Sequence, residues 1–203
     1  MFDYAADYSN IMFDEAGLER FKAALPFVTH HFRVIHGHFY MDKYADVIPD
    51  ARLMTCFRRP VDRVISQFRH IWYEGNPNSP LVERIENGFD IVDFAKGDYN
   101  VANAHRKHLS DRDPGTLDFV FINERLSEGL GLFHKMFPGI IQNQWALNTP
   151  HINDGDKRES QSKRPKLDIT PEQIAALGPV LADEIAYYDL AVARYEDTLA
   201  RHG

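Results

Sequence analysis

Arginine and hydroxyl side chains stand at a spacing that suits the binding of a phosphate group. Arg58 is followed eight positions later by Ser66, with Arg63 between them. A guanidinium group stays charged and binds two oxygen atoms at once, and a nearby hydroxyl adds a further hydrogen bond. The alternative is a solvated helix end at which Arg59 and Arg63 pair around Asp62. Spacing alone leaves both interpretations open.

Two histidines in the stretch FRVIHGHF could carry acid–base chemistry. The stretch predicts a short strand over residues 32–39, on which His36 and His38 share one face. Imidazole titrates near neutral pH, which suits it to take a proton from a hydroxyl group. By residue type alone, packing or surface histidines are the favoured alternative. Two histidines without a cysteine or histidine cluster give too few ligands, so we expect no metal site.

The elements that would position these side chains alternate between strands and helices, which predicts an α/β fold. The apolar run 52–57 predicts a buried strand of a parallel sheet, and Pro60 then begins a helix that ends at Gly75. Further elements are a helix over residues 14–25 ended by Pro26, short helices and loops over 80–114, a strand over 117–122, and a helix over 126–137. Thr170 and Gln173 form a capping box before C-terminal helices that Gly178 and Pro179 interrupt.

Charge and composition limit the possible partners. The chain has 203 residues, 44% of them hydrophobic, and a net charge of −7, which excludes a disordered chain and argues against a general nucleic-acid binder. The segments 52–70 and 157–166 each carry a net charge of +4 within this acidic chain. Two local basic segments favour an anion site over a broad basic surface.

Length and cysteine content indicate one domain, residues 1–203, in a reducing compartment. The sequence has no apolar run long enough to span a membrane and no signal peptide at its start. Its single cysteine, Cys56, cannot form an internal disulfide. We therefore expect a cytoplasmic location and no membrane segment.

The pattern Arg-x-Pro-x-x-Arg-x-x-Ser after an apolar strand resembles the 3′-phosphate-binding motif of sulfotransferases that use 3′-phosphoadenosine 5′-phosphosulfate (PAPS). The resemblance implies that Arg58 and Ser66 bind the 3′-phosphate of this donor, without a metal. Arg59 departs mildly from the family pattern, which usually has an acidic residue or asparagine there.

His36-Gly37-His38 resembles a His-Gly-His segment of heparan sulfate 2-O-sulfotransferase and its bacterial relatives. This resemblance implies that His38 is the catalytic base and that His36 supports it. It further implies a P-loop-NTPase-like sulfotransferase fold, with a parallel sheet flanked by helices, and a carbohydrate hydroxyl as the acceptor.

Three weaker similarities lie downstream. Ser162-Lys163-Arg164-Pro165 resembles the basic loop that closes over the cofactor, which implies cofactor contacts for Lys163 and Arg164; a solvated charged segment is the alternative. The segment 121–126 resembles a strand-to-helix segment of bacterial sulfotransferases, in which Glu124 and Arg125 would be ion-paired. The positions that correspond to acceptor-sugar contacts in relatives are Asn100, Asn103 and His105.

One part of the family pattern has no counterpart. Relatives wrap the 5′-phosphosulfate with a Pro-Lys-x-Gly/Ala-x-Thr-Ser loop, and no Pro-Lys pair occurs near the start of this chain. We therefore expect the N-terminal strand, loop and helix of the fold to be missing. The alternative function is a catalytically inactive, sulfotransferase-like binding protein. A P-loop kinase is disfavoured, because Gly-x-x-x-x-Gly-Lys-Ser/Thr is absent.

Overall fold

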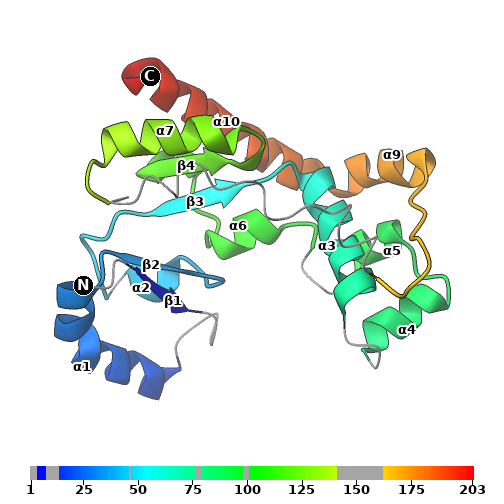
Figure 1. Ribbon diagram of the computed structural model, residues 1–203, viewed down its shortest axis with the longest axis horizontal. Helices are drawn as coiled ribbons and strands as arrows, with labels where there is room; N and C mark the ends of the chain where they lie inside the picture. The colour runs from blue at the N-terminus through cyan, green and yellow to red at the C-terminus, as the bar shows by residue number, and fades with distance from the viewer. Residues whose placement is uncertain (1–3, 8–13, 46, 76–78, 98–100, 141–161) are drawn as a thin grey trace.

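Short parallel strands flanked by helices form the scaffold in the computed structural model (Figure 1). The structure describes residues 4–7, 14–45, 47–75, 79–97, 101–140 and 162–203. In these ranges β1 (Tyr4–Asp7) pairs with β2 (Val34–Gly37), and β3 (Met54–Phe57) pairs with β4 (Phe119–Ile122). Both pairs are parallel, and Phe57 lies opposite Ile122 at the carboxyl end of the second pair. The fold is therefore α/β, as the alternation of patterns predicted.

The N-terminal elements differ from the expectation. A strand and a helix do precede β2: β1 is followed by α1 (Glu15–His31), and β1 lies parallel to β2. The prediction that Pro26 ends this helix is also wrong, because α1 continues through Pro26 to His31. Proline removes one backbone hydrogen bond, but the apolar spacing of Leu18, Phe21 and Leu25 continues at Val28.

The strand, turn and helix around Arg58 follow the sequence pattern closely. β3 ends at Phe57, and α3 (Pro60–Glu74) begins with proline at its first position and ends before Gly75. The buried residues of α3 are Pro60, Val64, Phe68 and Trp72. Between α3 and β4 lie α4 (Pro80–Glu86), α5 (Ile91–Lys96), α6 (Ala104–His108) and a 3₁₀ turn at Pro114–Thr116.

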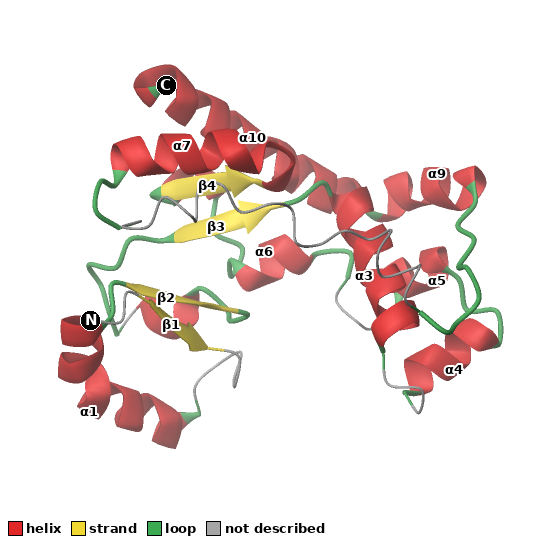
Figure 2. Cartoon of the chain, viewed as in Figure 1, coloured by secondary structure: helices red, strands yellow, loops and turns green. Residues whose placement is uncertain are grey.

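Two hydrophobic clusters hold these elements. In the first, α7 (Leu126–Met136) and α10 (Ala182–His202) lie side by side along β4, above the strands in Figure 2. Its members include Phe57, Phe119 and Tyr195. The second cluster joins α3, α4 and α5 to α9 (Pro171–Val180) around Phe68 and Phe94. The turn that follows β3 therefore runs from the first cluster into the second.

The C-terminal helices begin as predicted and divide slightly later. The capping box is present: Thr170 accepts from the Gln173 backbone N–H, and the Gln173 side chain accepts from the Thr170 N–H. The interruption falls at the fully buried Leu181 rather than at Gly178 and Pro179, which α9 includes. Among the helices of the described ranges, none is both long and apolar enough to cross a bilayer.

Candidate functional site

Arg58 lies at the carboxyl end of a parallel strand, where open α/β sheets bind ligands. It is the first residue after β3, and Arg59 is the N-cap residue of α3. Ser66 lies six residues into the helix from Pro60, about 9 Å along its axis. It stands on the α3 face opposite Val64 and Phe68, so packing into the second cluster does not occupy it. Both Arg58 and Ser66 are half-buried.

The backbone of this turn is held by two side chains from other elements. The Arg58 N–H donates to Nε2 of His105 at 3.5 Å, a long contact. The Arg59 N–H donates to Oε1 of Glu124 at 2.8 Å. The second carboxylate oxygen of Glu124 accepts from the hydroxyl of Tyr188 at 3.1 Å. Both amides of the turn are thus engaged.

Glu124 and Arg125 do not form the predicted ion pair. Arg125 instead pairs with Glu128 at 2.6 Å and also with Glu196 on α10. The two neighbours separate because they lie in the 3₁₀ turn Asn123–Arg125 between β4 and α7. Glu124 is directed to the β3–α3 turn, and Arg125 to α7 and α10.

A buried carboxylate lies behind the turn. Glu184 of α10 is fully buried, and its Oε1 lies 2.8 Å from Nδ1 of His105 and 3.6 Å from the Arg63 guanidinium. Arg63 also donates to the carbonyl of Val101. The alternative in which Arg59 and Arg63 pair around Asp62 is therefore wrong for Arg63, whose carboxylate partner is Glu184. Burial alone would raise the pKa of Glu184, but hydrogen bonds from His105 and the charges of His105 and Arg63 lower it.

The orientation of the His105 ring follows from its partners. Nε2 accepts from a backbone N–H, so in the neutral ring the proton sits on Nδ1, which faces Glu184. The ring also packs on Phe57 of β3, with the centroids 4.8 Å apart. Glu184, His105 and the turn therefore form one chain of polar contacts from α10 to the end of β3.

The His-Gly-His segment spans the carboxyl end of β2. His36 is in β2 and His38 follows the strand, and both are exposed. Nδ1 of His108, on α6, lies 3.4 Å from the carbonyl oxygen of Phe39, the residue after His38. Burial lowers the pKa of His108, and the positive charges of His38, His105 and Arg63 lower it further, against the effect of the Phe39 carbonyl. His38 thus lies near enough to His108 for their charges to interact.

The basic loop contacts the opposite end of α3. Arg164 stacks over Trp72, with 5.2 Å between guanidinium and ring centroid, and donates to the carbonyls of Trp72 and Gly75. The 15 residues of α3 span about 22 Å, so this end is far from Arg58. Lys163 is exposed. The structure therefore separates Arg164 from Arg58 along α3, and Ser66 lies midway along the helix between them.

Two aromatic residues near the carboxyl end of α3 make hydrogen bonds to the segment that precedes α9. Trp72 is buried and donates to the Pro165 carbonyl at 2.9 Å, and the Tyr73 hydroxyl accepts from the Leu167 N–H at 2.9 Å. Both rings therefore serve packing. Of the positions that correspond to sugar contacts in relatives, Asn103 is exposed at the start of α6, whereas Asn100 lies outside the described residues.

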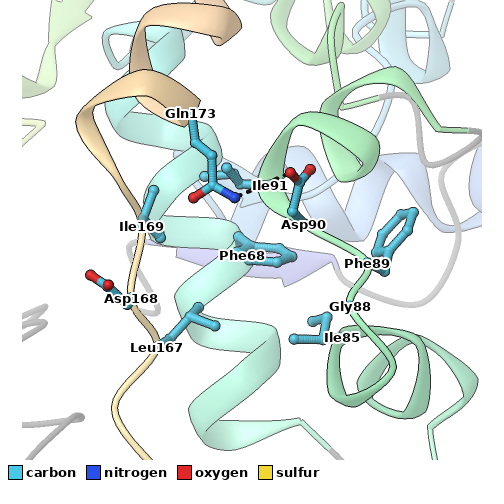
Figure 3. A pocket seen from close by; sticks show the side chains of 10 residues that line it. All are labelled: Phe68, Ile85, Gly88, Phe89, Asp90, Ile91, Leu167, Asp168, Ile169 and Gln173. Atoms are coloured by element: carbon cyan, nitrogen blue, oxygen red, sulfur yellow. Dashed lines mark hydrogen bonds between the residues drawn. The ribbon is translucent and has the colours of Figure 1, made fainter.

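A small hollow of about 170 Å³ lies on the other side of α3. Phe68, Asp90, Leu167 and Gln173 are among the residues that line it (Figure 3). Two of its polar side chains already have partners, because Asp90 caps α5 and accepts from the Gln173 amide at 3.1 Å. The hollow includes neither Arg58, Ser66 nor His38, so it is separate from the candidate site.

Sequence reasoning missed Glu184, His108 and Tyr188. One signal was present for Glu184: it precedes Tyr187 and Ala191 at helical spacing, on the face that α10 buries. A carboxylate on an apolar stripe needs a hydrogen-bonding partner when the stripe is buried. No sequence signal identified that partner.

The arrangement can bind an anion and can accept a proton. Arg58 offers a guanidinium beside the N-terminus of α3, Ser66 offers a hydroxyl further along the same helix, and the histidines offer imidazole nitrogens. Over the described residues, no three histidine, cysteine, aspartate or glutamate side chains group as metal ligands would. Comparison of the chain with models of protein families found no match, and comparison with curated proteins found no similar sequence.

Proposed function

We propose that the protein is a sulfotransferase that transfers a sulfuryl group from PAPS to a hydroxyl group, most simply that of a carbohydrate. One observation carries the proposal: the arginine of the Arg-x-Pro-x-x-Arg-x-x-Ser motif leaves a parallel strand, and the serine lies on the next helix, facing away from its buried side. A phosphate-binding motif needs this strand–turn–helix context. The proposal includes a P-loop-NTPase-like sulfotransferase fold and a cytoplasmic location.

In the proposed reaction, Arg58 and Ser66 hold the 3′-phosphate of the donor. His38 takes the proton of the acceptor hydroxyl, and the oxygen attacks sulfur in line. An S–O bond forms to the acceptor as the S–O bond to the 5′-phosphate breaks, and adenosine 3′,5′-bisphosphate leaves. His38 then releases its proton to solvent. The exposure of His38 leaves it open both to an acceptor and to water.

A second candidate function is nucleotide binding without catalysis. Sulfuryl transfer, like phosphoryl transfer, depends on stabilising charge on the leaving group. The chain has no match to the Pro-Lys-x-Gly/Ala-x-Thr-Ser loop that supplies this stabilisation in relatives. Loss of one such donor typically costs about a hundredfold or more in rate. The binding function needs only Arg58, Ser66 and the turn.

Calorimetric titration with adenosine 3′,5′-bisphosphate tests the binding that both candidates share. We expect the wild type to bind it more tightly than adenosine 5′-monophosphate, because only the former has a 3′-phosphate. Arg58→Ala should lose about tenfold or more in affinity, as expected for a charge-assisted contact. Arg201→Ala is the matched control, because Arg201 is an exposed arginine near the end of α10.

Two outcomes contradict the proposal: no binding by the wild type, or equal binding by Arg58→Ala and Arg201→Ala. Transfer of radiolabelled sulfate from PAPS to a panel of glycans then separates the two candidates. Turnover establishes the enzyme, whereas specific binding without turnover establishes the binding protein.

A further inference from the structure

The two backbone amides of the β3–α3 turn are connected through side-chain contacts to one face of the C-terminal helix, α10. The Arg58 N–H contacts His105, whose ring and backbone N–H both contact Glu184 at 2.8 Å. The Arg59 N–H contacts Glu124, which accepts from the Tyr188 hydroxyl. Glu184 and Tyr188 are four residues apart on α10, so they are neighbours on its surface. Two adjacent side chains of one helix therefore support two adjacent amides of the turn, each through one intermediate residue.

We propose that Glu184 and Tyr188 are positioning residues, and that α10 holds the β3–α3 turn in the conformation that binds an anion. The ligand assigned to the turn rests on the proposed function; the positioning itself does not. Fixing the two amides fixes the backbone from which the Arg58 side chain leaves. A guanidinium that is already oriented loses less conformational freedom when it binds a phosphate, which strengthens binding.

Burial and charge support this role for Glu184. Its carboxylate is fully buried, and burying a charge is costly unless partners compensate it. Its partners are Arg63 of α3, the helix that follows the turn, and His105 of α6, whose ring contacts the Arg58 N–H. An apolar residue could fill this position without the cost of burying a charge. We therefore attribute the carboxylate to the orientation of its two partners, Arg63 and His105.

The Tyr188 contact has a different character. Tyr188 is half-buried, and burial together with Glu124 raises its pKa to about 12, against the opposing effect of Arg59. The hydroxyl therefore stays protonated at neutral pH and donates steadily to the carboxylate. With that hydrogen bond in place, Glu124 keeps its other oxygen on the Arg59 amide.

The chain offers a matched control on the same helix. Tyr195 also donates its hydroxyl to a glutamate, Glu128 of α7, at 3.0 Å, but Glu128 contacts Arg125 and not the turn. Tyr188→Phe and Tyr195→Phe each remove one hydroxyl that bonds a carboxylate. Only the first removes support from the turn.

Residue-resolved amide hydrogen exchange by NMR tests the positioning without any ligand. We expect Tyr188→Phe to speed exchange of the Arg59 amide by about five- to tenfold, the size of one hydrogen bond, and Glu184→Gln to speed exchange of the Arg58 amide similarly. Amides of β4 should keep their rates. In Tyr195→Phe, the Arg58 and Arg59 amides should exchange as in the wild type.

Titration of the same variants with adenosine 3′,5′-bisphosphate tests the consequence. Tyr188→Phe should bind about five- to tenfold more weakly, and Tyr195→Phe should bind as the wild type does. Unchanged exchange of both turn amides in Tyr188→Phe and Glu184→Gln would overturn the positioning role. So would faster exchange that spreads equally to β4, because this would indicate general destabilisation. If the wild type binds no bisphosphate, the proposed function fails, and the exchange rates alone decide the positioning.

Discussion

Oε1 of Glu184 lies 2.8 Å from both Nδ1 and the backbone nitrogen of His105, although the two residues are 79 positions apart in the chain. The same oxygen lies 3.6 Å from the Arg63 guanidinium. One atom thereby ties α10 to α6 and to α3, directly behind the turn that carries Arg58. This junction is where the packing of the fold and the chemistry of the candidate site depend on the same side chain.

Removal of this carboxylate should be costly for stability. Glu184→Ala leaves the largely buried Arg63 guanidinium without its counter-charge and the His105 ring without its polar neighbour, so we expect a loss of about 3 kcal/mol in the free energy of unfolding. Urea denaturation measures it. The control is Glu196→Ala, which removes an exposed partner of Arg125 and should cost less than about 1 kcal/mol. Equal losses in the two variants would contradict the junction described above.

Acid should lower the free energy of unfolding in two steps. The pKa of His108 is lowered from its ordinary 6.5, so the unfolded chain binds a proton before the folded one does. The stability due to neutral His108 is thus complete above pH 6.5 and declines as the pH falls through the lowered pKa. The pKa of Glu184 is lowered from 4.5, so its contribution is complete above pH 4.5 and is lost only at lower pH.

His108→Gln separates these steps. Between pH 7.5 and pH 5.5 the wild-type urea midpoint should fall more than that of His108→Gln, because the variant has no imidazole to protonate at this site. His134→Gln, which changes an exposed histidine of α7, should retain the wild-type slope. A slope that His108→Gln leaves unchanged would show that other groups cause the acid sensitivity.

Two basic residues of the 162–166 segment, Arg164 and Lys163, should behave differently when they are substituted. Arg164→Ala removes the stacking on Trp72 and two hydrogen bonds to backbone carbonyls, so we expect a loss of about 2 kcal/mol in stability. Lys163→Ala, at an exposed side chain, should leave stability unchanged. Thermal unfolding measures both. Weaker bisphosphate binding by Lys163→Ala at wild-type stability would support the cofactor contact that the family resemblance implies.

Substitution of the proposed catalytic base should affect turnover and leave nucleotide binding intact. His38→Ala should lower kcat by about a hundredfold or more, because general base catalysis contributes about that much, and should leave bisphosphate affinity unchanged. His36→Ala should have a smaller effect, and His134→Ala none. Full activity in His38→Ala would remove this histidine from the mechanism and direct attention to His108 and His105.

Local rules accounted for much of the scaffold. The apolar run before Arg58 and the proline at position 60 correctly predicted β3 and the start of α3, and the capping box at Thr170 correctly predicted the start of α9. These features depend on residues within a few positions of one another. Pro26 shows the limit of such rules, because the helix it was expected to end continues for five residues more.

By itself, the sequence determined the strand–turn–helix unit that presents Arg58 and Ser66, since backbone sterics, capping and apolar spacing act over short stretches of chain. Only the tertiary structure decided which side chains meet at that unit. Arg63 pairs with Glu184 and not with the nearby Asp62. Glu124 accepts from the Arg59 amide and does not pair with the adjacent Arg125. His108 lies within range of the charge on His38. A charged or polar side chain takes its partner from whatever packing brings within hydrogen-bonding distance, and that partner can come from any part of the chain.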